Sequence, residues 1–160
     1  MLDFLHLHAL WLIMDPWLPH PWPKDRQRWP HIDQHNQKTI DDIVDYLPNL
    51  RHVTVSVSPA YSVHPTLQHL PNTENRFARL DTMMQALQLT DIVYIGFHWG
   101  HCLLRKPDGA INVSKRTQYK LYAYPRLCSI LPHSNDEILT KKMSNYVMLL
   151  KNYRDPVDHD

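Results

Sequence analysis

Residues 91–104, DIVYIGFHWGHCLL, constrain the fold of this chain more than any other stretch. Strand-forming residues run up to Gly96, and Cys102 follows six positions later. In open α/β sheets, a buried strand that ends at a glycine and a tight turn places a reactive side chain at the carboxyl edge of the sheet. We therefore consider Cys102 as a nucleophile, the alternative being a small hydrophobic residue of the core.

Strands and helices alternate along the rest of the chain. Apolar or β-branched runs predict strands at residues 9–15, 52–59, 91–96 and 119–125. Helical spacing of apolar residues predicts helices at residues 37–47, 73–90 with Thr73 as N-cap, 107–116 opened by Pro107, and 138–150. This order favours a three-layer α/β/α fold, Rossmann-like, with a mostly parallel sheet. Residues 1–151 are expected to form one domain, followed by a polar tail at 152–160.

The segment 16–33 is rich in proline and tryptophan, with five prolines and three tryptophans. Proline restricts both its own φ and the residue before it, so we expect an extended loop here without regular helix. Its tryptophans, with Tyr61 and Tyr124, either form an aromatic pocket for a flat ligand or simply cover the edge of the sheet.

Right-handed crossovers bring the carboxyl ends of all parallel strands to one edge, where a ligand is expected to bind. That edge gathers Asp15, which ends the first strand, and the turn that carries Cys102. Asp15 could act as the base for the thiol, and His98 could replace it as proton acceptor or serve as a hydrogen-bonding loop residue. The residues expected to contact a substrate are Trp17, Tyr61, His64, Trp99 and His101.

The charge and cysteine content exclude several classes of function. Seventeen basic and sixteen acidic residues, with no charge block, give no reason to expect nucleic acid or a membrane as a partner. Two cysteines outside any zinc-type cluster indicate a reducing cytoplasm and no metal site, and His64 and His69 are too few to suggest one. No glycine-rich phosphate loop follows a strand, so no nucleotide cofactor is expected.

The strand ALWLIMD that ends in Asp15 and the glycine-to-cysteine motif GFHWGHC resemble the isochorismatase-like hydrolase superfamily over residues 9–150. The resemblance implies Asp15 as base and Cys102 as nucleophile. It also implies a cis peptide bond between Phe97 and His98, an oxyanion hole formed by the N–H groups of His98 and Cys102, and self-association into a homo-oligomer.

The chain departs from that family at several positions. The family's catalytic lysine is expected between the second strand and the cysteine strand, yet residues 53–99 contain no lysine. Arg76 and Arg79 are the cations of that window, and a guanidinium does not shuttle protons at neutral pH. The segment RKPDG also interrupts the long helix that follows the cysteine in the family.

Two functions from different classes therefore remain. One is a divergent isochorismatase-like hydrolase that acts on a small amide, ester or vinyl-ether substrate through Cys102. The other is a catalytically inactive binding or assembly module of the same fold. The first depends on Asp15 and Cys102 meeting at one edge of the sheet, and the second on the missing lysine.

Overall fold

The structure, a computed structural model, describes residues 1–98, 102–130 and 147–150 of the 160-residue chain. Its centre is a five-stranded sheet in the order β2-β1-β3-β4-β5. The strands are β1 (Ala9–Met14), β2 (His52–Ser56), β3 (Asp91–Gly96), β4 (Lys120–Cys128) and β5 (Met148–Leu149). The first four pair in parallel and β5 pairs antiparallel with β4, so the fold is mixed α/β with a mostly parallel sheet.

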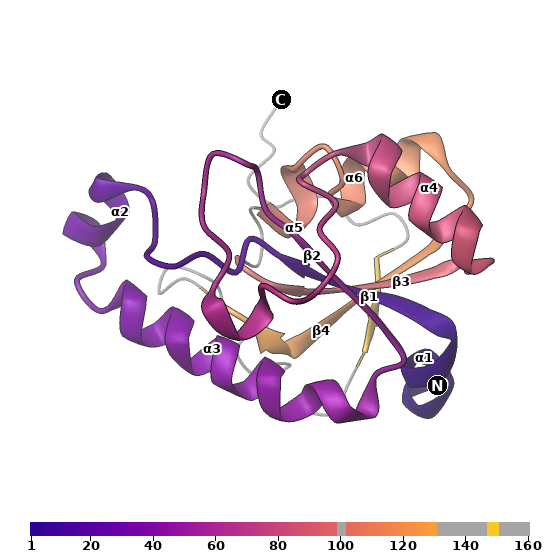
Figure 1. Ribbon diagram of the computed structural model, residues 1–160, viewed down its shortest axis with the longest axis horizontal. Helices are drawn as coiled ribbons and strands as arrows, with labels where there is room; N and C mark the ends of the chain where they lie inside the picture. Colours follow the sequence, from indigo (N-terminus) through magenta and orange to yellow (C-terminus); the bar gives the residue numbers. More distant parts are fainter. Residues whose placement is uncertain (99–101, 131–146, 151–160) are drawn as a thin grey trace.

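The central strands are buried on both faces, as expected for a parallel sheet covered by helices. Every residue of β1 and of β3 is buried. In Figure 1, α3 (Ile32–Tyr46) lies on one side of the sheet, and α4 (Phe77–Leu87) and α6 (Ala110–Arg116) lie on the other. The hydrophobic core fills the space between these layers, with Trp11, Tyr94 and Tyr124 among its largest fully buried side chains.

The strand order explains where a site can form. The connection from β1 to β2 runs through α3, whereas the chain after β3 continues through α5 (Cys102–Arg105) and α6 on the other side of the sheet. Since β1 and β3 are neighbours, their carboxyl ends lie at the point where the connections diverge. In doubly wound folds this point is the usual ligand crevice.

The strands at 52–59, 91–96 and 9–15 were predicted within a few residues, but several helix predictions are wrong. The segment 16–33 contains a helix, α2 (Pro23–Arg28), because Pro23 stands in its first turn, where a missing N–H costs no hydrogen bond. The N-terminal residues form another helix that was not expected, α1 (Leu2–His8). Thr73 is not an N-cap: Arg76 holds that place in α4. The helix α6 begins at Ala110 rather than Pro107.

The C-terminal part also differs from the prediction. The fourth strand does not end at Pro125 but continues to Cys128, because the pairing with β3 shifts register there and a proline is tolerated at such an irregularity. Most of the helix predicted at 138–150 and the tail at 152–160 lie outside the described residues, but Met148–Leu149 is a strand. Within the part of the chain that is described, no helix has the length and apolarity needed to traverse a membrane.

Candidate active site

Asp15 and the cysteine turn follow two neighbouring strands. Met14, the last residue of β1, is paired with Gly96, the last residue of β3. Asp15 follows directly in a left-handed conformation (φ 49°), and its backbone N–H donates to the Ser56 carbonyl at 2.8 Å. Gly96 has φ 101°, and a Cβ atom there would lie 2.5 Å from the Met14 carbonyl oxygen. Glycine is thus required at this crossing because the backbone of β1 leaves no space for a side chain.

The structure brings Asp15 and Cys102 together, as the sequence predicted. Cys102, only 7% exposed, lies close enough to the fully buried Asp15 carboxyl group for each to shift the pKa of the other. The backbone N–H of His98 also donates to the Cys102 sulfur. The Phe97–His98 peptide bond is cis, as the resemblance implied. A thiol, a carboxylate and a backbone donor therefore meet at the carboxyl edge of the sheet.

A lysine completes this cluster, and sequence reasoning missed it. Lys106 Nζ lies 3.5 Å from Asp15 Oδ2, with 23% of its side chain exposed. It comes from the RKPDG segment rather than from residues 53–99, and its backbone N–H donates to the Cys102 carbonyl at 3.3 Å. The signal was local: a cysteine and a lysine four residues apart lie on the same side of a helical turn.

The electrostatics of the cluster follow from burial. Desolvation raises the pKa of Asp15 from its ordinary value of 3.8 to about 6, although Lys106 and the hydrogen bonds from Cys102 and Asn75 oppose the shift. Burial and the neighbouring Asp15 carboxylate raise the pKa of the Cys102 thiol well above its ordinary range. At neutral pH the pair therefore rests as a thiol beside a carboxylate, with one proton to exchange.

A buried polar network supports Asp15 from the β2 side. Asn75 Nδ2 donates to Asp15 Oδ1 at 3.2 Å and to Ser56 Oγ at 2.7 Å. Ser56 and Thr73 in turn each donate a 2.6 Å hydrogen bond to Asp108 Oδ2. Asp108 follows Lys106 closely in the chain, so this network ties the RKPDG segment to the second strand and holds the lysine near Asp15.

Two of the residues predicted to contact a substrate lie near Asp15. Trp17 and Tyr61 lie in one aromatic cluster, with ring centroids 6.0 Å apart, and Trp22 lies 4.8 Å from Trp17. Lys106 Nζ lies over the rings of Trp17 and Trp22, at 5.8 and 5.9 Å. Trp17 and Trp22 of the proline-rich segment thus adjoin the Asp15 cluster. Trp99 and His101 lie outside the described residues.

The two predicted histidines that are described make structural contacts. The His98 ring bonds through Nε2 to Asn36 Oδ1 at 3.1 Å and stacks on Phe97. His64 contacts Gln37 Oε1 through Nε2 at 2.9 Å and Thr66 Oγ1 through Nδ1 at 2.8 Å. Both nitrogens of His64 are engaged, and burial lowers its pKa. The geometry favours Asp15 over either histidine as the base for Cys102.

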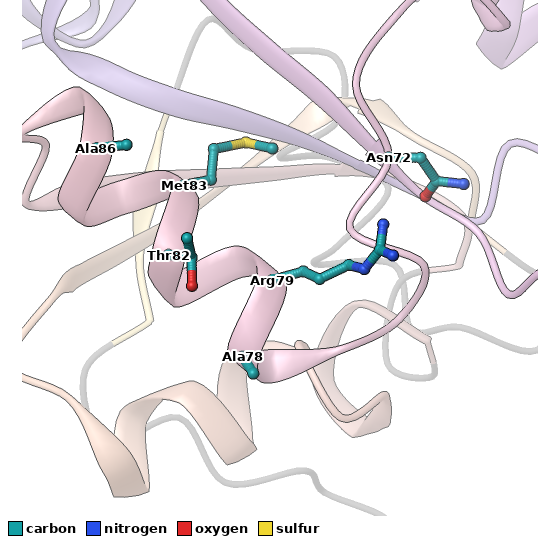
Figure 2. Close-up of a pocket in the computed structure, with 6 residues that line it drawn as sticks. All are labelled: Asn72, Ala78, Arg79, Thr82, Met83 and Ala86. Atoms are coloured by element: carbon teal, nitrogen blue, oxygen red, sulfur yellow. The ribbon is translucent and has the colours of Figure 1, made fainter.

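Two other features bear on function. Across residues 1–98, 102–130 and 147–150, no group of three or more histidine, cysteine, aspartate or glutamate side chains could hold a metal ion. A surface pocket lies on α4, lined by Asn72, Ala78, Arg79, Thr82, Met83 and Ala86 (Figure 2). It contains neither Asp15 nor Cys102, so it is separate from the cluster described above.

Comparison with known proteins identified no relative. No protein-family model matches the chain, and neither the curated proteins nor the solved structures gave a significant match.

Proposed function

We propose that this protein is a small-molecule hydrolase of the isochorismatase-like type, with Cys102 as nucleophile and Asp15 as base. The observation that carries the proposal is the contact of the Cys102 thiol with a buried carboxylate that also faces Lys106 at 3.5 Å. Aspartate, cysteine and lysine are the residue types that the resemblance implies, and only the lysine comes from a different part of the chain. The substrate class is a small amide, ester or vinyl ether.

The chemistry follows from the rest state of the pair. For a carbonyl substrate, Asp15 takes the proton of the Cys102 thiol as the sulfur attacks the carbonyl carbon. The leaving group departs with that proton, and water then cleaves the thioester to release the acid and the free thiol. The Lys106 charge favours the ionised form of Asp15, and the backbone N–H of His98 favours negative charge on the sulfur.

The pH dependence tests the base. Because Asp15 must be ionised to accept the proton and its pKa is raised to about 6, hydrolysis should increase as pH rises through about 6. Initial rates on p-nitrophenyl acetate and small anilides between pH 4 and pH 9 would measure this limb. Rates that do not change around pH 6 and rise only above the ordinary pKa of a thiol, about 8.5, would contradict Asp15 as the base.

Substitution tests the assigned roles. Cys102→Ser and Asp15→Asn should each lower the rate by at least about 100-fold, the usual contribution of a positioned nucleophile or base. Lys106→Met should move the rise of the hydrolysis rate to higher pH, because this cation lowers the pKa of Asp15. Lys106→Arg keeps the charge and should leave that rise near the same pH. Lys38→Met on the exposed face of α3 is the matched control.

A binding module without catalysis is the second candidate, and the burial of Cys102 favours it. Cys102 is only 7% exposed, and the pKa of its thiol is raised rather than lowered. Iodoacetamide labelling followed by mass spectrometry distinguishes the two. The Asp15 charge raises the pKa of the thiol, so slow labelling of Cys102 that Asp15→Asn leaves unchanged or accelerates would support the binding module. Labelling that Asp15→Asn slows strongly, because the base that takes the thiol proton is lost, would support the hydrolase.

A further inference from the structure

Beside the Asp15 cluster, two buried polar atoms lack a hydrogen-bond partner. Trp17 Nε1 and His20 Nδ1 are both shielded from solvent, and within the described parts of the chain nothing bonds to either. Trp17 is 3% exposed and the His20 side chain 0%. Their rings are in contact, with centroids 5.4 Å apart. Buried polar groups are nearly always satisfied, so two unpaired polar atoms on rings in contact need an explanation.

The hydrogen-bonding character of each atom is determined by chemistry. The indole N–H of Trp17 can only donate. His20 Nε2 lies 2.8 Å from Asp25 Oδ2, and a carboxylate can only accept, so His20 carries a proton on Nε2. In the neutral imidazole, Nδ1 then presents a lone pair and is an acceptor. Together the two rings offer one donor and one acceptor.

The surroundings define the shape of what fits. His20 contacts Trp22 at 5.4 Å and His98 at 5.5 Å, and Trp22 and Tyr61 pack against Trp17. These walls are aromatic and favour a flat ring. Trp22 and Tyr61 are 36% and 37% exposed, so they form the outer side of this aromatic cluster.

The position links this pair to the reacting residues. The Trp17 backbone N–H donates to the Asp15 carbonyl at 2.7 Å, and Lys106 Nζ lies 5.8 Å from the Trp17 ring centroid. Lys106 is already paired with Asp15, so it leaves little charge to attract an anion, and a carboxylate would meet the lone pair of His20 Nδ1. A neutral ligand group therefore suits the site better than an anionic one.

We propose that Trp17 and His20 form a binding subsite for a neutral, flat heterocycle with a lactam edge. Its carbonyl oxygen accepts from Trp17 Nε1, and its adjacent N–H donates to His20 Nδ1. The proposal concerns binding, so it holds whether or not Cys102 reacts.

The test compares two probes by isothermal titration calorimetry. 2-Pyridone offers both a carbonyl and an N–H, and N-methyl-2-pyridone offers the carbonyl alone. The unmodified protein and its Cys102→Ser variant should both bind 2-pyridone at least about tenfold more tightly than N-methyl-2-pyridone. The methylated probe cannot donate a hydrogen bond to the buried acceptor. Use of Cys102→Ser separates this result from the fate of the proposed hydrolase.

Two variants assign the discrimination to named atoms. His20→Phe keeps a ring but removes the acceptor, so the preference for 2-pyridone should vanish. Trp17→Phe keeps a ring but removes the donor. It should weaken the binding of both probes by about tenfold, and 2-pyridone should still bind more tightly than its methylated analogue. His69→Phe, at an exposed loop position, should change neither affinity.

Three results would overturn the proposal. They are equal affinity of the two probes for the unmodified protein, discrimination that survives in His20→Phe, and no binding of either probe at millimolar concentration. Circular dichroism checks that each variant is folded. If His20→Phe is not, the effect of Trp17→Phe on both probes decides the matter, and unchanged affinities in that variant would refute the subsite.

Discussion

Replacing Asp15 with asparagine should make the protein more stable while it removes the proposed base. The carboxyl group is fully buried, and its pKa is raised from 3.8 to about 6, chiefly by desolvation. The folded state therefore binds the Asp15 proton more tightly than the unfolded state does. Stability is consequently lost as pH rises from about 4 to about 6, and the full cost remains at higher pH.

The magnitude follows from the shift. The difference between 6 and 3.8 is about 2.2 pKa units, and at 1.36 kcal/mol per unit this is about 3 kcal/mol at pH 8. The linkage relation for one group gives about half of this amount at pH 5 and about a fifth of it at pH 4. Asp15→Asn resembles the protonated carboxyl group, so it should raise the free energy of unfolding by up to these amounts.

Urea denaturation of both proteins at pH 4, 5 and 8 measures the effect. The difference between variant and unmodified protein should grow with pH, because only the unmodified protein carries the buried charge. Asp45→Asn, at an exposed position of α3, is the control and should show no such trend. A variant that is less stable at pH 8, or a gain that is the same at all three pH values, would refute the reasoning.

Further substitutions test the surroundings of the site. Gly96→Ala should destabilise the fold by about 2 kcal/mol or more in urea denaturation, because its Cβ would lie 2.5 Å from the Met14 carbonyl oxygen at a φ of 101°; a loss below about 0.5 kcal/mol would contradict this. Ser56→Ala should cost about 1–3 kcal/mol, because Asp108 loses one of its two 2.6 Å donors; a neutral result would mean that water replaces the hydroxyl. Lys106→Met should slow iodoacetamide labelling of Cys102 at pH 7, because the Lys106 charge lowers the pKa of that thiol; equal labelling of the two proteins would contradict this effect.

Much of the fold could be predicted from local patterns. The continuous apolar run before Asp15 and the β-branched run from His52 identify strands because a buried parallel strand needs apolar side chains on both faces. The glycine at position 96 identified the end of the cysteine strand. The helix α2 could not be predicted from proline content, because the effect of a proline depends on whether it stands in the first turn or the interior.

The candidate site was also predicted only in part. Asp15 and Cys102 were identified as residues at the ends of strands, and their placement needed only the rule that parallel strands share a carboxyl edge. Lys106 was overlooked because the expected lysine was sought elsewhere in the chain, although its spacing from Cys102 was visible. Asn75 and Asp108 carried no signal in the sequence, since hydrogen bonds between distant segments leave no periodic pattern.

By itself, the sequence determined the alternation of strands and helices and the residue types available at the ends of the strands, because these depend on neighbours along the chain. The tertiary structure alone decided which of those residues meet: the lysine that faces Asp15, the partners that occupy His64, and the unpaired atoms of Trp17 and His20. The physical reason is that desolvation, pKa shifts and hydrogen bonding depend on distance in space. Residues far apart in the chain acquire these properties only when the sheet and its helices bring them together.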